Sequence, residues 1–190
     1  IIMNDDTGNL HGKTGTDPDG VEHPANTPEG LMSDPIAYGV RIPEVDTISW
    51  SFAGIEQYAY DSKVGEMLGQ VPYPGAPKQD LKLLGQFWHN MKTFLDAGTD
   101  PLRIVVEYSH AQGREVFASL RMNMIQDSWR QSAYSKWKRE HMDLCLGERG
   151  ERLHGNQHEL RYSCWSALDF EHGAVRDLRL AVIEEVCTGY

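Results

Sequence analysis

Several side chains suited to binding a sugar lie at the end of the strand that the sequence predicts at residues 115–122. Arg121 and Asn123 stand at the end of this strand, and Asp127 and Trp129 follow in the next segment. Arginine presents several donors in a rigid fork, and asparagine both donates and accepts, so both suit sugar hydroxyls. An acid near a tryptophan is a common sugar-binding combination, because the indole face packs on the apolar side of a pyranose. These residues predict a carbohydrate-binding surface.

Each of these residues also has a structural interpretation. Arg121 would support the rim of the sheet by pairing with a core acid. Asp127 would cap the following helix, and Trp129 would pack its loop against the fold. The ligand-binding and the structural interpretations both stay open on the sequence alone.

The other predicted strands add further candidates. Asp5 and Asp6 follow the first strand, and neighbouring strand residues point in opposite directions, so these two cannot form the carboxyl pair of a glycosidase. We expect Asp6 either to face the pocket, with Asn4 beside it, or to order the following loop. Trp50 would form a sugar platform or belong to the core, and Trp165 would close the pocket wall.

The segment before the last helix contains cysteines and histidines of the types that bind metal ions. Cys145, His154, His158 and Cys164 are spaced C-x8-H-x3-H-x5-C. Zinc modules commonly use short CxxC pairs, so we expect no metal and no cofactor here. The sparse cysteines argue against a disulfide framework, although a single Cys145–Cys164 bridge stays open. Asp169 is interpreted as a cap of the last helix.

Hydrophobic periodicity predicts the elements that would position these residues. Strands are expected at 1–3, 45–52 and 115–122, a short extended piece at 166–169, and helices starting at 27 and at 80–97, 101–112, 132–145 and 172–187. Alternating strands and helices favour a parallel sheet. Each long loop follows a strand, as in a (β/α)-barrel, where the loops after strands form the active face. Neither a GxGxxG nor a P-loop motif occurs, which weakens a nucleotide-binding interpretation.

Four stretches of the sequence resemble one family. EVFASLRMN at 115–123, QDSW at 126–129, WSALDFEH at 165–172 and VRDLRLAVIEEV at 175–186 are similar to bacterial proteins with glycosyl hydrolase-like 10 domains. AGTDPL at 97–102 and the Ser109-His110 pair fit the same pattern. The resemblance runs across nearly the whole chain, and it implies a TIM-barrel hydrolase that cleaves glycosidic bonds by acid/base catalysis.

The resemblance also implies what surrounds this chain. In such proteins a helix like 172–187 leads into a fourth strand that ends in acidic residues, so we expect the catalytic carboxylates beyond Tyr190. The fold expected for 1–190 is therefore a single α/β domain, an incomplete (β/α)8 TIM barrel of about three βα units with long βα loops. The alternative is a non-catalytic carbohydrate-binding or scaffold protein on the same fold. A metal-dependent hydrolase would need histidine pairs at the strand ends, and the predicted strands have none.

The amino-acid composition limits the classes of partner that this chain is expected to bind. The net charge of −10 gives little basis for binding nucleic acid, and no apolar run approaches the ~20 residues that cross a bilayer. We expect a carbohydrate partner, no nucleic acid and no membrane. The chain opens within a strand at Ile1, so the true start is expected upstream and the localisation, including export from a bacterium, stays unknown. Open sheet edges predict self-association of the chain alone.

Overall fold

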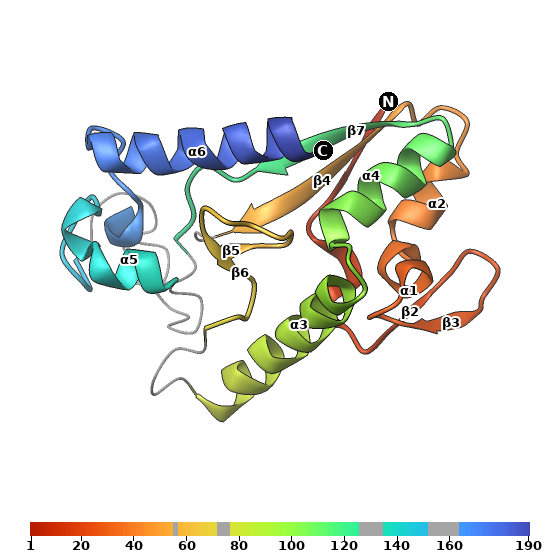
Figure 1. The fold of residues 1–190 in the computed structure, drawn as a ribbon, viewed down its shortest axis with the longest axis horizontal. Helices are drawn as coiled ribbons and strands as arrows, with labels where there is room; N and C mark the ends of the chain where they lie inside the picture. The colour runs from red at the N-terminus through yellow and green to blue at the C-terminus, as the bar shows by residue number, and fades with distance from the viewer. Residues whose placement is uncertain (55–56, 72–76, 126–134, 152–163) are drawn as a thin grey trace.

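Three parallel strands form the centre of the sheet in the computed structural model, which describes residues 1–54, 57–71, 77–125, 135–151 and 164–190 (Figure 1). β4 (Thr47–Gly54) lies in the middle and pairs in parallel with β1 (Ile2–Asp5) and with β7 (Glu115–Leu120). These are the strands predicted at 1–3, 45–52 and 115–122. The strands therefore stand side by side in the order β1, β4, β7, which is their order along the chain.

Two short strands make the sheet mixed. β5 (Gln57–Tyr58) pairs antiparallel with the last residues of β4, and β6 (Glu66–Met67) pairs in parallel with β5. The sequence predicted a parallel sheet, so this antiparallel extension corrects the prediction. These five strands form an open sheet, and the chain is a mixed α/β protein with six α-helices in its described part.

The major helices cover one face of the sheet. α3 (Lys78–Asp96), α4 (Pro101–Ala111) and α6 (Gly173–Gly189) all contribute side chains to the core on this face. Alternate residues of β4 point toward them, and the core joins the following side chains: Ile48, Trp50, Phe52, Met91, Phe94, Leu102, Val105, Val182 and Val186. Burial of this apolar surface is the main term that holds the helices to the sheet.

The opposite face of the three parallel strands is more polar and more exposed. The register places Ile2 beside Thr47, and Asn4 beside Ser49. Since side chains alternate along a strand, these residues share the face that the core does not use. Ile2 is 58% exposed and Phe117 is 50% exposed, so apolar side chains on this face meet solvent.

The helix boundaries follow the local signals in the sequence. The Thr27 side chain accepts a hydrogen bond at the start of α1 (Pro28–Met32), and Asp100 caps α4 by accepting from the amide of Arg103 at 3.0 Å. Gly98 and Gly113 follow α3 and α4 with φ of 77° and 71°, which is the left-handed conformation that favours glycine. The predicted starts at Thr27 and Pro101 and the predicted stops at these glycines are confirmed.

Other segments differ from the prediction. The helix expected at 132–145 is represented by α5 (Lys136–Glu140) and a 3₁₀ turn, η4 (Met142–Leu144), while 132–134 lie outside the described residues. The extended piece expected at 166–169 has a single bridge, from Leu168 to Cys145. Elements that were not predicted are η1 (Gly8–His11), β2 (Thr14–Thr16), β3 (Glu22–Pro24), α2 (Ile36–Val40) and η6 (Cys164–Ser166). In the part of the chain that the structure describes, no helix has the length and apolar character to cross a bilayer.

Candidate functional site

Polar side chains gather where the two outer parallel strands, β1 and β7, end. Asp6 directly follows β1 and Arg121 directly follows β7, and Ser49, the third residue of β4, lies between these strands beside Asn4. Ser49 donates to Asn4 Oδ1 at 3.3 Å, and Asn4 Nδ2 donates to Asp6 Oδ1 at 3.4 Å. The parallel pairing brings the ends of β1 and β7 to one side of the sheet, and the register of β1 against β4 places Asn4 beside Ser49. We call Asn4, Asp6, Ser49 and Arg121 the strand-end cluster.

An ion pair connects the two outer strands of this cluster. The guanidinium of Arg121 contacts Asp6 Oδ2, and both side chains are accessible, at 37% and 61% exposure. The hydrogen bond from Arg121 and its positive charge lower the pKa of Asp6, against a smaller opposing effect of burial. Asp6 therefore stays ionised at neutral pH and accepts hydrogen bonds. Arg121 does pair with an acid, although that acid lies at the surface and not in the core.

The backbone adopts an uncommon conformation directly after Asp6. Asp5 is buried on the core face beside Trp50, and Asp6 is exposed on the opposite side, as the alternation of strand residues predicted. Thr7 then adopts φ of 66°, a left-handed conformation that is unfavourable for a β-branched residue. Backbone strain of this kind is found in structures at functional sites, where surrounding contacts hold it in place.

A second carboxyl group lies at the same edge of the sheet. Gln57 pairs with Gly54, the last residue of β4, and Glu66 pairs with Gln57. Gln57 Nε2 donates to Glu66 Oε1 at 2.7 Å, and the amide of Lys136 donates to Oε2 at 2.6 Å. Burial nevertheless raises the pKa of Glu66, and these two hydrogen bonds only partly oppose it. Glu66 was not predicted, because its strand is two residues long and has no recognisable pattern.

Asn123 lies just beyond the end of β7 and contacts the backbone of a distant segment. Its Nδ2 donates to the carbonyl oxygen of Leu168 at 2.8 Å, and its Oδ1 accepts from the amide of Leu168 at 2.9 Å. The side chain thus ties the end of β7 to the segment before α6. Asp127 and Trp129 lie outside the described residues.

The two other predicted tryptophans are core residues. Trp50 is 0% exposed and Trp165 is 2% exposed, so neither indole face is available to a ligand in this structure. Trp50 packs between the sheet and the helices, which corrects the expectation of a sugar platform and supports the core interpretation. The expectation that Trp165 lines a pocket wall is corrected for the same reason.

The structure also describes some of the residues considered as metal ligands or as a helix cap. Cys145 and Cys164 are both free thiols, so the open alternative of a bridge is not realised, and His154 and His158 lie outside the described residues. The described residues contain no group of three or more histidine, cysteine or acidic side chains that could hold a metal ion. Asp169 accepts from the amide of Glu171 at 2.8 Å and orders the turn before α6; the cap position itself is His172.

The chemistry available at this edge is polar recognition together with a protonatable acid. The strand-end cluster offers a guanidinium, a carboxylate, an amide and a hydroxyl on accessible surface, which matches the donor and acceptor pattern of a polyol. A comparison with models of known protein families and with curated protein sequences finds no match to this chain.

Proposed function

We propose that the chain forms part of a (β/α)-barrel of the glycoside-hydrolase type, and that the strand-end cluster binds the carbohydrate. Three features of the fold support the barrel. Its parallel strands are neighbours in chain order, its major helices lie on one face, and its long segments follow the strands. Doubly wound α/β folds place helices on both faces, whereas a barrel keeps them outside.

The observation that carries the proposal is the position of the Asp6–Arg121 pair. Ligand-binding groups of (β/α)-barrels lie at the carboxyl ends of the strands. This pair is found there, joined to Asn4 and Ser49 by hydrogen bonds and open to solvent. An ionised acid and a guanidinium that neutralise each other present many donors and acceptors with little net charge. Such a surface suits a neutral sugar better than a highly charged one.

The two carboxyl groups at this edge take separate roles in the proposal. Asp6 is an ionised acceptor for sugar hydroxyls, and Glu66, whose pKa is raised by burial, is the group able to carry a proton. Opposite shifts of this kind separate an acid from a base in glycosidases. The resemblance assigns the main catalytic carboxylates to a strand after residue 190, so the described residues supply binding and positioning groups.

A non-catalytic carbohydrate-binding protein is the second candidate. One observation favours it: Asp6 is engaged by Arg121, and both oxygens of Glu66 already accept hydrogen bonds. A catalytic acid needs a free path to the glycosidic oxygen, whereas a binding group does not.

Binding and hydrolysis are measured separately to distinguish these functions. The 190-residue chain is tested for binding to a panel of soluble polysaccharides by affinity electrophoresis, and the intact parent protein is tested for release of reducing ends. Arg121→Gln and Asp6→Asn should each weaken binding by roughly tenfold, because each removes a charged hydrogen-bonding partner. Glu107→Gln, an exposed acid on α4, is the matched control and should leave binding unchanged.

Each pattern of results has one meaning. Binding with hydrolysis supports the enzyme, and binding without hydrolysis supports the second candidate. If no carbohydrate binds, or if Glu107→Gln weakens binding as much as Asp6→Asn, the proposal is wrong.

We also propose that the chain by itself associates through the open side of its sheet. β7 pairs with β4 alone among the described strands, and Ile2 and Phe117 expose apolar side chains on the uncovered face. Unpaired strand edges of this kind recruit another chain. Light scattering over a range of concentrations should show a mass that rises above one chain, and Phe117→Lys should reduce this rise. A constant monomeric mass would contradict it.

A further inference from the structure

A cavity of about 260 Å³ lies away from the strand-end cluster, between the beginning of α3 and the segment that joins η1 to β2. His11 and Lys13 line it from the η1 side. Gln79, Lys82 and the half-buried Leu83 line it from α3. The cavity thus combines basic and amide donors with an apolar contribution from Leu83.

The η1 wall of this cavity is fixed by a buried side chain. Asn90 of α3 is 1% exposed, and its Nδ2 donates to the carbonyl oxygens of Leu10 and Gly12 at 2.8 and 3.0 Å. These two carbonyls flank His11 in the chain. The His11 ring also lies against the Phe87 ring, with centroids 6.2 Å apart. The backbone that carries His11 and Lys13 is therefore held against α3.

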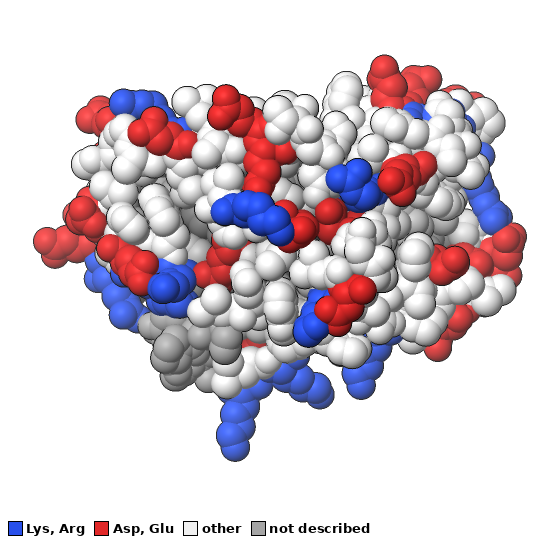
Figure 2. Space-filling view, viewed as in Figure 1, with Lys and Arg blue, Asp and Glu red and all other residues white. Residues whose placement is uncertain are grey.

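The cavity concentrates positive charge in a protein whose net charge is −10. In the described part of the chain, Lys13 and Lys82 take part in none of the ion pairs, whereas Lys92, on the same helix, pairs with Asp96 at 2.6 Å. Asp80 is the one acid in the lining. Figure 2 shows basic side chains projecting along the lower edge of the molecule, where Figure 1 draws α3.

We propose that this cavity binds a small oxyanion, namely a phosphate or sulfate group, either free or attached to a small molecule. Lys13, Lys82 and His11 supply charged or ring N–H donors, and the Gln79 amide adds a neutral one. The beginning of α3 adds the positive end of a 19-residue helix dipole. The volume accommodates the anion and a compact attached group, and Leu83 provides an apolar contact for that group.

The test uses inorganic phosphate and methyl phosphate as probes, with the whole chain and with ionic strength held constant by chloride. Amide chemical shifts are followed during titration of each probe. We expect saturable shifts centred on the cavity, with Kd on the order of 1 mM. Lys13→Gln and Lys82→Gln should each raise Kd by roughly fivefold or more, because each removes a charged donor. Tighter binding of methyl phosphate identifies an ester as the ligand, and equal binding identifies the free anion.

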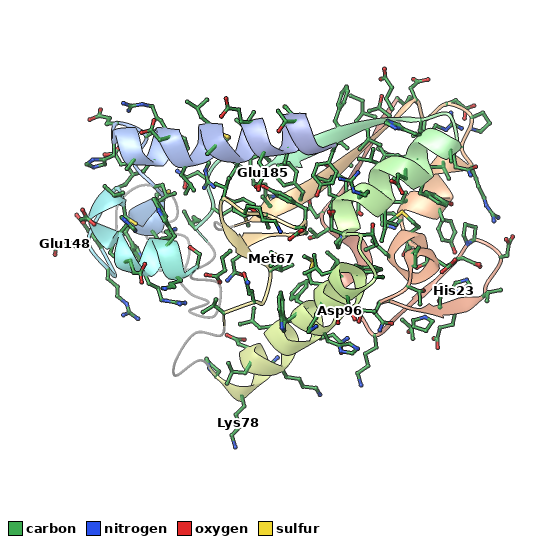
Figure 3. The ribbon with its side chains drawn as sticks, viewed as in Figure 1. His23, Met67, Lys78, Asp96, Glu148 and Glu185 are labelled. Atoms are coloured by element: carbon green, nitrogen blue, oxygen red, sulfur yellow. The ribbon has the colours of Figure 1, made fainter. Side chains whose placement is uncertain are left out.

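Lys78→Gln is the control, because Lys78 is the first residue of the same helix but does not line the cavity, and Figure 3 shows its side chain projecting from the start of α3. It should change Kd by less than about twofold. Circular dichroism confirms that each variant keeps its helices. The proposal is overturned if phosphate gives no saturable shifts. It is equally overturned if Lys78→Gln weakens binding as much as Lys82→Gln, which would show general attraction to surface lysines.

Discussion

Glu185 anchors α6 to the segment after β5, and its substitution gives the sharpest test of how the helix layer is held. Figure 3 shows Glu185 projecting from α6 toward the strands. Its Oε2 accepts from the Tyr60 hydroxyl at 2.7 Å and from the Ser62 hydroxyl at 2.8 Å, and its Oε1 accepts from the amide of Lys63 at 2.6 Å. Burial raises the pKa of Tyr60 above its usual range, so the phenol stays protonated and donates.

The magnitude follows from what Glu185→Gln can still accept. The side-chain oxygen of glutamine can replace one carboxylate oxygen as an acceptor. The NH2 group takes the place of the other oxygen, and because it is itself a donor it cannot accept the hydrogen bond that this oxygen accepted. One or two charge-assisted hydrogen bonds are lost, each contributing about 1.5–3 kcal/mol, and relaxation recovers part of this. We expect the free energy of unfolding to fall by about 2 kcal/mol.

Urea denaturation followed by circular dichroism measures this change. A double-mutant cycle adds Tyr60→Phe, which should cost about 1 kcal/mol in the parent chain and much less in the Glu185→Gln background. Glu184→Gln is the control, because Glu184 is the exposed neighbour on α6, and it should lie within about 0.5 kcal/mol of the parent. A loss below about 0.5 kcal/mol for Glu185→Gln, or additive effects in the cycle, would refute the assigned contacts.

Further predictions concern the backbone, the core and pH. Thr7→Gly should raise the free energy of unfolding by roughly 1 kcal/mol, because glycine adopts φ of 66° without the strain of a Cβ; a loss of stability in urea denaturation would contradict this. Asn90→Ala should lower it by about 2–3 kcal/mol, since it leaves two backbone carbonyls without their donor, and an effect within about 0.5 kcal/mol would be inconsistent with the buried contacts. The raised pKa of Glu66 means that ionisation opposes folding, so its stabilising contribution is present below pH 4.5 and is lost as pH rises through the folded pKa. Glu66→Gln should remove this pH dependence from denaturation curves. The pKa of Asp6 is shifted in the opposite direction, so its ionisation favours folding. This stabilising contribution is present above pH 3.8 and is lost as pH falls through the folded pKa. Arg121→Gln should abolish this pH dependence.

Long periodic elements could be predicted from sequence because each also has local boundary chemistry. α3 and α6 carry apolar residues at helical spacing, and α4 begins at an Asp100-Pro101 pair. The two-residue periodicity of a strand likewise explains the buried position of Trp50. Alternation along β4 places it on the face of Ile48 and Phe52, which favours a core position over a sugar platform.

The β2–β3 hairpin was not predicted, because each strand is three residues long and shows no alternation. The turn signal was nevertheless present. Asp17 Oδ1 accepts from the amides of Asp19 and Val21, both at 2.9 Å, and Gly20 has φ of 81°. Pro18-Asp19-Gly20 is a turn sequence with a known physical basis, and it would have identified this segment.

The sequence predicts several residues of the candidate site, but it does not predict which of them contact one another. Asp6 and Arg121 were each recognised at a strand end, yet their contact depends on β1 and β7 flanking β4, which no local pattern encodes. Asn123 was predicted at the correct strand end, but its pairing with the backbone of Leu168 depends on a distant segment. Residues that are far apart in the chain meet through tertiary packing, and local sequence patterns do not predict such contacts.

The most direct test of the central claim is to locate a bound carbohydrate on the chain by NMR. An oligosaccharide from the polysaccharide that binds best is titrated into labelled protein, and the amide and Arg121 side-chain N–H signals are followed. The account predicts that the largest shifts fall at Asn4, Asp6, Ser49 and Arg121, and that they disappear in Arg121→Gln. Shifts that cluster elsewhere, or that persist unchanged in this variant, would contradict a carbohydrate site at the strand ends.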